Sequence, residues 1–334
     1  MYNIPKIDLH LHLDGSLNMD LAYKKAVEKQ LVSENISFSD FKKLMEVHNA
    51  NNLSEYLAKF DLAITLLQTE NDLFDFTYQL IVDLEKKGII YAEIRFAPQF
   101  LVNNNQELAV KTVLRAKEIA KQNGLKIEVN FILCMMVLGP LEKTLNNNIK
   151  TIHLVNKYLN KGVCAIDLAG AEGLIPMSEF KSLFDLINDL DLPMTIHAGE
   201  QAGPESVKTA ISFNTKRIGH GIKAIEDLDV IKSLIENSIT LEVCPTSNIN
   251  TKNQQSYQTH VIKDLLDLGV KVCVNTDNMT VSNTDLDQEY LHLIQDRKLT
   301  KKQILLTIRY AIEASFASEN LKNNLLLTLS KADI

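Results

Sequence analysis

Several features that would place this chain in other classes of protein are missing from its sequence. It has no run of basic residues, and its formal net charge is -7 over 334 residues. Nucleic-acid binding by counterion release needs a positive surface, so we expect no nucleic-acid partner, and a small-molecule substrate stays open. No stretch approaches roughly 18 uninterrupted apolar residues, and nothing before residue 4 could serve as a signal peptide. We therefore expect a cytoplasmic protein without a membrane segment.

The cysteines are few and show no C-x-x-C spacing. Each lies within or at the end of an apolar, strand-like run, at Cys134, Cys164, Cys244 and Cys273. We expect reduced thiols in the core rather than disulfides or metal ligands, in keeping with a cytoplasmic protein.

Strand-like and helix-like segments alternate along the whole chain. Strands are expected at residues 4–11, 89–96, 126–134, 163–168, 194–197, 216–219, 239–243 and 270–275. Apolar residues at helical spacing predict helices at 73–87, 107–122, 141–159, 177–190, 225–236 and 259–268. Eight such units predict an α/β fold, a (β/α)8 TIM-type barrel. An open doubly wound sheet is the alternative, but no G-x-G-x-x-G follows the first strand.

Two regions exceed a minimal barrel. Residues 17–72 are expected to form several helices over the C-terminal mouth, at 17–29, 40–47 and 54–68. Residues 299–334 are expected to add two C-terminal helices. No internal repeat or linker is visible, so we predict one domain over residues 1–334.

Polar side chains gather at the carboxyl ends of the predicted strands, where the active site of such a barrel lies. His10 and His12 end the first strand, His197 the fifth and His220 the sixth, and Asp277 follows the eighth. Side chains on a strand repeat with a period of two, so the first two histidines face the same way, with Cα atoms roughly 6.5–7 Å apart. Alone, such a pair is more often structural. With the other strand-end residues it predicts a metal site.

Three histidines and one carboxylate suit one zinc ion with a position left open for water. The assigned ligands are His10, His12, His197 and Asp277. Glu200, three residues after a ligand, is placed to shuttle a proton, whereas His220 could be a further ligand or a base. The predicted fourth strand has no lysine to bridge two metals, which favours one ion. Because zinc lowers the pKa of bound water to roughly 7, hydrolytic attack on an electrophilic carbon is expected.

Six blocks of sequence carry a resemblance that covers essentially the whole chain. They are His10-Leu-His-Leu-Asp-Gly-Ser16, Ile166-Asp-Leu-Ala-Gly-Ala-Glu172, Ile196-His-Ala-Gly-Glu200, Arg217-Ile-Gly-His-Gly221, Cys244-Pro-Thr-Ser-Asn248 and Asn275-Thr-Asp277. Each block alone is moderately specific, but all six in this order and spacing are very specific. The chain resembles the adenosine deaminase family of the amidohydrolase superfamily.

This resemblance implies a zinc-dependent deaminase of adenosine and 2′-deoxyadenosine in purine salvage. Glu200 would protonate purine N1 while hydroxide attacks C6, and His220 would orient or deprotonate the water. Asp277 would bind zinc and accept a hydrogen bond from the hydroxide. The backbone N–H of Gly170 would meet purine N3, where a glycine permits close approach. Asp14 would accept from a ribose hydroxyl, and His12 would also face the substrate.

Residues near the C-terminal end of the predicted barrel indicate which aminopurine is the substrate. Similar adenine deaminases carry Glu where this chain has Asp14, and they lack the Ala169-Gly170 pair; the shorter acid leaves room for a ribose. Within residues 52–61, one helical face, made of Leu53, Tyr56, Leu57 and Phe60, resembles a helix that covers adenosine. Helix-on-barrel packing explains that face equally well. A related aminopurine, adenine or an N6-modified adenosine, remains the alternative substrate.

The chain departs from the family pattern after the eighth strand. Where Asp-Asp-Pro is usual, the sequence reads Asp277-Asn278-Met279. The second residue would face purine N7, which accepts hydrogen bonds. An amide donates to N7 at any pH, but a carboxylate must first be protonated. We therefore expect the contact to survive and Asn278→Asp to remain active with altered substrate affinity or pH dependence.

Other candidate residues are expected to be structural. Surface or packing roles are predicted for His48, His153, His260 and His292. Arg95 is expected to form an ion pair with a strand-end acid. Ser247 and Asn248 lack the G-x-S-x-G setting of a nucleophile and are expected to shape the loop after the seventh strand. The sequence leaves the oligomeric state open.

Overall fold

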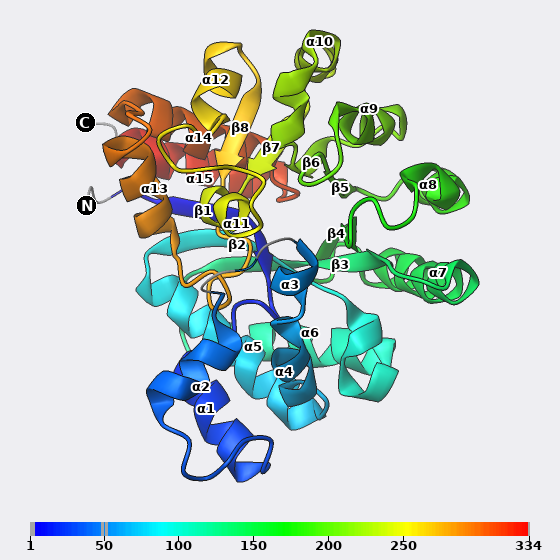
Figure 1. Ribbon diagram of the computed structural model, residues 1–334, viewed down its shortest axis with the longest axis vertical. Coiled ribbons are helices and arrows are strands. Elements are labelled where there is room, and N and C mark those ends of the chain that lie inside the picture. Colours follow the sequence, from blue (N-terminus) through cyan, green and yellow to red (C-terminus); the bar gives the residue numbers. More distant parts are fainter. Residues whose placement is uncertain (1–3, 48–49, 51–52, 333–334) are drawn as a thin grey trace.

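The computed structural model describes residues 4–47, 50 and 53–332. Eight strands run in parallel within this part of the chain (Figure 1). They are β1 (Lys6–His12), β2 (Ile89–Phe96), β3 (Glu128–Val137), β4 (Val163–Gly170), β5 (Thr195–Ala198), β6 (Arg217–His220), β7 (Thr240–Val243) and β8 (Lys271–Val274). All eight predicted strands are present, and most boundaries differ by one or two residues.

Hydrogen bonds join the strands into a closed ring. The strands pair in sequence order from β1 to β4 and from β5 to β8. Ile166 N donates to Pro193 O at 2.9 Å and links β4 to the start of β5. His12 N donates to Asp277 O at 2.7 Å, and Asp277 N donates to His10 O at 2.8 Å, which links β1 to the end of β8. The predicted TIM-type barrel is confirmed.

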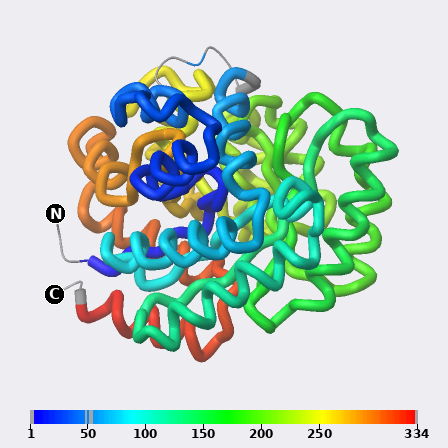
Figure 2. Tube along the Cα trace, turned by 90° about the horizontal axis from the view of Figure 1, so that it is seen from below, coloured from blue at the N-terminus to red at the C-terminus, as the bar shows by residue number. Residues whose placement is uncertain are grey.

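Helices surround the barrel between successive strands (Figure 1). They are α5 (Glu70–Lys86), α6 (Gln106–Gln122), α7 (Leu141–Tyr158), α8 (Lys181–Asp189), α9 (Pro204–Ser212), α10 (Leu228–Glu236), α12 (Ile262–Asp267) and α14 (Lys301–Ala314). Local capping sets several boundaries. Thr300 begins α14 with a capping box to Gln303, which satisfies backbone N–H groups that the helix leaves open. Helix α14 packs on both β1 and β8 and completes the ring of helices. Figure 2 shows the start of β1, in blue, and the C-terminal helix, in red, on the same side of the molecule.

Some helices differ from their predicted form. The helix predicted at 177–190 begins as a 3-10 turn, Met177–Phe180, before α8. The helix predicted at 54–68 divides into α3 (Leu53–Leu57) and α4 (Phe60–Leu66), because Lys59 N bonds to Tyr56 O over a tight three-residue turn. Sequence patterns also missed α9, α11 (Pro245–Asn250) and α13 (Leu286–Gln295).

The other predicted additions to the barrel are present. Helices α1 (Met19–Glu28) and α2 (Phe38–Met45) precede α3, and α15 (Glu319–Ala332) follows α14. Lys25 of α1 bonds to Asp72 and Asp75 of α5 at 2.7 Å each, which fixes the N-terminal insertion to the ring of helices. Among the residues that the structure describes, no helix has the length and apolarity that crossing a membrane requires.

Candidate active site

The strand-end histidines and Asp277 converge at one point. The ligand nitrogens of His10, His12 and His197 lie within 4.8 Å of one another, and the ligand atoms of His10, His220 and Asp277 do so as well. Asp277 Oδ1 is 3.5 Å from His10 Nε2 and 3.4 Å from His12 Nε2. The structure therefore brings the four predicted ligands together and places His220 beside them.

These residues fit a divalent metal ion. His10 Nε2 is buried and has no hydrogen-bond partner among the described residues, although buried polar atoms normally have one. His10 Nδ1 contacts Glu242 at 2.9 Å, and His197 Nδ1 contacts Asp167 at 2.9 Å. A carboxylate on one ring nitrogen directs the other toward a metal, an arrangement common in metal sites. Burial also lowers the pKa of His12, which keeps its imidazole neutral as metal binding requires.

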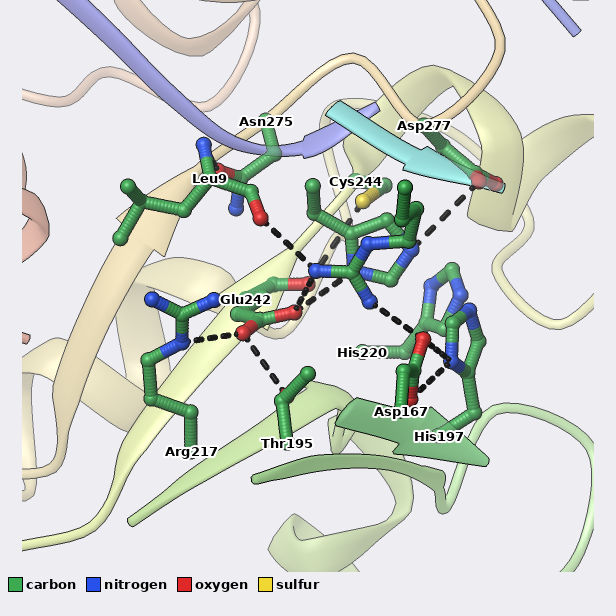
Figure 3. Close-up of polar contacts among 12 residues, drawn as sticks. Leu9, Asp167, Thr195, His197, Arg217, His220, Glu242, Cys244, Asn275 and Asp277 are labelled. Carbon is green, nitrogen blue, oxygen red and sulfur yellow. Dashed lines mark hydrogen bonds and ion pairs between the residues drawn. The ribbon is translucent and has the colours of Figure 1, made fainter. Parts of the chain in front are cut away.

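A network of buried charges forms the floor of the site. Arg95 contacts Asp167 at 2.8 Å and Glu242 at 2.7 Å, and Arg217 contacts Glu242 and Glu93 at 2.6 Å each. All five side chains are 0% exposed. Burial opposes ionisation of Glu242, but the two arginines hold its pKa well below the usual value. Figure 3 shows Glu242 against Arg217 and Asp167 against His197. The predicted ion pair of Arg95 with a strand-end acid is confirmed.

Helix α11 supports the other two site residues. Ser247 Oγ donates to Asp277 Oδ2 at 2.5 Å, and the Asn248 amide nitrogen lies 3.0 Å from His220 Nδ1. His220 and Asp277 both have φ near 60°, a conformation that costs energy for residues other than glycine and is concentrated at functional sites. Ser247 and Asn248, expected to shape the loop after the seventh strand, lie in a short helix there and contact two site residues.

Glu200 lies beside the histidine cluster. Its side chain is nearly buried, and Oε2 is 3.7 Å from His220 Nε2. Burial raises the pKa of Glu200 well above its usual value, and the charges of Asp277 and Glu172 raise it further. A carboxyl group in such surroundings holds its proton near neutral pH and can act as a general acid.

The cluster opens into a cavity of about 550 Å³, within the range of small-molecule sites. Its walls include the predicted substrate residues His12, Asp14, Gly170 and Asn278. Burial raises the pKa of Asp14 to about 6, and its Oδ1 lacks a hydrogen-bond partner within the described part of the chain. Gly170 has φ +107°, and an added Cβ would lie 3.1 Å from Val137 O. A glycine is therefore required at this position.

Helices α3 and α4 contribute apolar side chains to the same cavity. Tyr56, Leu57 and Phe60, three of the four residues predicted on the covering face, line it. The side chain of Leu53 and the whole of Asn52 lie outside the described residues. Tyr56 also packs against Val281 of the barrel, so cavity lining and helix-on-barrel packing occur together.

Asn278 is hydrogen-bonded to helix α3, which together with α4 forms a lid over the cavity. Its amide nitrogen donates to Tyr56 Oη at 2.9 Å, and the same hydroxyl lies 2.8 Å from Ser282 Oγ. Asn278 Oδ1 is buried without a partner in the described residues. A Cβ on Gly15 would lie 1.9 Å from that oxygen, so the glycine provides the space for Asn278. The second N–H of the amide remains for a ligand.

The histidines predicted to be structural lie away from this cluster. His153 is exposed on α7, and His260 is fully buried with its Nδ1 accepting from Ile262 N at 3.2 Å. His292 stacks on Tyr257 with ring centroids 3.9 Å apart. His48 lies outside the described residues. All four cysteines are buried free thiols, as predicted.

Known proteins of one family match the chain over nearly its whole length. A family model described as "Adenosine deaminase" matches residues 5–332. The chain is 40% identical to an adenosine deaminase from Clostridium acetobutylicum, covering 98% of this chain and 97% of that protein. It is 42% identical to an adenosine deaminase from Haemophilus ducreyi, covering 96% and 94%. The crystal structure of an N6-mAMP deaminase from Arabidopsis is similar with a TM-score of 0.86 at 26% identity, covering 98% of both chains.

Proposed function

Because the chain belongs to the adenosine deaminase family, we propose that it deaminates adenosine and 2′-deoxyadenosine hydrolytically to inosine and ammonia, with one zinc ion per chain. One observation carries the proposal: the buried acid Glu200 and the histidine cluster face the same cavity. A proton donor and a metal site side by side are what hydrolysis at an amino-substituted purine ring requires.

The residues around the cluster can be given roles in this reaction. Zinc bound by His10, His12, His197 and Asp277 would supply a Lewis acid that lets water react near neutral pH. His220, held by Asn248, would orient the water or take its proton. The protonated Glu200 would donate to purine N1 as an oxygen bond forms at C6. As the C6–N6 bond breaks, N6 would receive the proton taken from the water and leave as ammonia, and the C6 hydroxyl would return a proton to Glu200.

Three further residues would position the nucleoside. The N–H of Gly170 would donate to purine N3, and the free N–H of Asn278 would donate to N7. Asp14, whose Oδ1 lacks a partner among the described residues, would accept from a ribose hydroxyl. His12 at the cavity wall would also face the substrate. The buried free thiols support a cytoplasmic location, where cysteines remain reduced.

An alternative substrate is a related aminopurine, such as adenine or an N6-modified adenosine. The similarity to the Arabidopsis N6-mAMP deaminase favours keeping N6-modified adenosine under test. Asp14 argues against free adenine, because its carboxyl group in the cavity needs a hydroxyl donor such as a ribose provides.

A substrate panel with metal analysis tests the proposal. Turnover of adenosine, 2′-deoxyadenosine, adenine and N6-methyladenosine is followed by absorbance, with the zinc content of each preparation. We expect preference for the adenosines and, for Glu200→Gln, a loss of about 10²- to 10⁴-fold in kcat. Glu205→Gln, the same change at an exposed residue of α9, is the control. Preference for adenine, or full activity of Glu200→Gln, would contradict the proposal.

A further inference from the structure

One carboxylate binds the backbone of the segment that carries Glu200. Glu172 follows β4, and its two side-chain oxygens accept five hydrogen bonds. Oε1 accepts from Gly199 N and Ser206 Oγ at 2.6 Å each, and Oε2 accepts from Glu200 N, Gln201 N and Ala202 N at 3.0, 2.7 and 3.1 Å. The whole turn from residue 199 to residue 202 is therefore fixed by a single side chain.

The turn at residues 199–202 points consecutive backbone N–H groups toward one place, where an anion can accept them. Consecutive N–H groups that point to one place make a concave anion-binding site, and hydrogen bonds to a carboxylate are about twice as strong as neutral ones. Gly199 has φ +66°, and a Cβ there would lie 2.4 Å from Val207 Cγ2, so the close turn requires glycine. Without an acceptor, the N–H groups of the buried Gly199 and Glu200 would be left unpaired.

Glu172 also connects two sides of the cavity. Its backbone N–H donates to Gly170 O at 3.0 Å, so it lies in the turn that follows the purine-facing glycine. Its side chain reaches across to the end of β5 and holds the residue that faces His220. The same negative charge, after burial and Asp277, contributes to the raised pKa of Glu200.

We propose that Glu172 is a positioning residue for the deamination. Its carboxylate fixes the turn at residues 199–202 and so directs Glu200 toward the substrate, beside the histidine cluster. This inference rests on the proposed function and adds to it a residue with no direct contact to substrate. Glu172 acts through Glu200, and a change in Glu172 misplaces the proton donor while leaving nucleoside binding and the metal ligands in place.

Glu172→Gln is the first test. The amide keeps the size of the side chain but turns an NH₂ group toward N–H donors. We expect kcat to fall about 10- to 100-fold, the cost of a small misplacement of a catalytic group, while KM stays within about threefold. Zinc content and the midpoint of thermal unfolding are measured on the same samples. Glu205→Gln, the same charge change on neighbouring α9, is the matched control and should keep wild-type kcat.

A double-mutant cycle separates positioning from a general structural effect. If Glu172 acts through Glu200, adding Glu172→Gln to Glu200→Gln should lower kcat by no more than about twofold, since residues that act as a unit are not additive. If Glu172→Gln lowered kcat as much in the Glu200→Gln protein as it does in the wild type, the inference would be overturned. A loss of kcat that only follows lost zinc or lost folded protein, or no loss at all, would overturn it as well.

The same measurements keep the two proposals apart. An active wild type and an equally active Glu172→Gln would overturn the positioning role alone. A wild type that contains zinc and turns over none of the four purines would overturn the proposed function, and the positioning role with it.

Discussion

The floor and the lid of the cavity are built in different ways. The floor consists of charged side chains from β2, β4, β6 and β7, all 0% exposed and joined by ion pairs of 2.6–2.8 Å. The lid meets the barrel rim through apolar contacts, the hydroxyl of Tyr56, and a hydrogen bond from Gln68 Nε2, just after α4, to Phe100 O at 2.8 Å. The floor is therefore fixed when the barrel folds, whereas the lid depends on a few contacts that single substitutions can remove.

Because of this difference, substitutions in the floor and in the lid should have different effects on the protein. Substitutions in the floor should lower metal affinity, because Glu242 and Asp167 contact the ring nitrogens of His10 and His197. Changes in the lid should act on substrate affinity and leave the metal in place.

The largest effect is expected from Glu242→Gln. The substitution removes the charge that faces Arg95, Arg217 and His10. We expect metal affinity to fall about 10- to 100-fold, the usual cost of losing a group that orients a ligand. The free energy of unfolding should fall by about 3–5 kcal/mol, because buried arginine charge is left uncompensated. Chelator competition and urea unfolding measure the two quantities.

The control for this change is Glu236→Gln at the exposed end of α10, where the acid only approaches Lys232 at 3.8 Å. It should match the wild type in both measurements. Wild-type metal affinity in Glu242→Gln would mean that the floor does not orient His10, and the division between floor and lid would fail.

A smaller effect, on substrate affinity alone, is expected from Tyr56→Phe. The ring stays in the lid, but Asn278 and Ser282 lose their shared partner. We expect KM to rise about 5- to 30-fold, which corresponds to roughly 1–2 kcal/mol, with kcat and zinc content unchanged. Tyr78→Phe, which removes a hydroxyl that accepts from Asn123 at the surface, is the control. A change in zinc content instead of KM would show that the lid also governs the floor.

Asn278→Asp tests the same contact from the barrel side. Aspartate can accept from the Tyr56 hydroxyl, so the lid contact can be kept, but it could donate to the proposed acceptor, purine N7, only when protonated. We expect the variant to remain active, with a KM that rises by less than about tenfold as increasing pH ionises the new carboxyl group. The wild-type amide gives no such dependence at this position. Complete loss of turnover would show that the role of Asn278 is misread.

The site residues whose positions follow from local sequence pattern could be predicted from the sequence. His10 and His12 share one strand face, and the other strand-end residues follow apolar runs, so the barrel predicts their meeting. Their supports were not predictable in this way, because Glu242 lies in the middle of a strand 232 residues from His10. Nothing local distinguishes it from an ordinary strand residue.

Segments with weak periodicity were also missed. Helix α9 has only 9 residues and begins at Pro204 after an irregular turn, and α11 has 6 residues, too few for a helical repeat to be visible. Glu172 was recognised only as the end of a motif. Four of its five partners are backbone N–H groups of residues 199–202, which no side-chain pattern reveals.

The smallest effect on turnover, but a clear effect on stability, is expected from Glu289→Gln, a substitution at a residue that supports α11. Glu289 of α13 is fully buried and accepts from Thr284 Oγ1 at 2.7 Å and from Thr246 N of α11 at 3.2 Å. Burial raises its pKa from 4.5 to about 7. Between these values the folded state holds more protons than the unfolded state, so stability falls as pH rises through this window.

The glutamine variant cannot ionise and should lack this slope. Its free energy of unfolding relative to the wild type should therefore increase from pH 5 to pH 8, by at most about 3 kcal/mol for a shift of this size. Urea unfolding at both pH values measures the difference, and the exposed Glu236→Gln provides the reference. Parallel pH curves for the wild type and Glu289→Gln would mean that Glu289 is solvated. In that case α11, which holds Asp277 and His220, would belong with the adaptable lid rather than with the rigid floor.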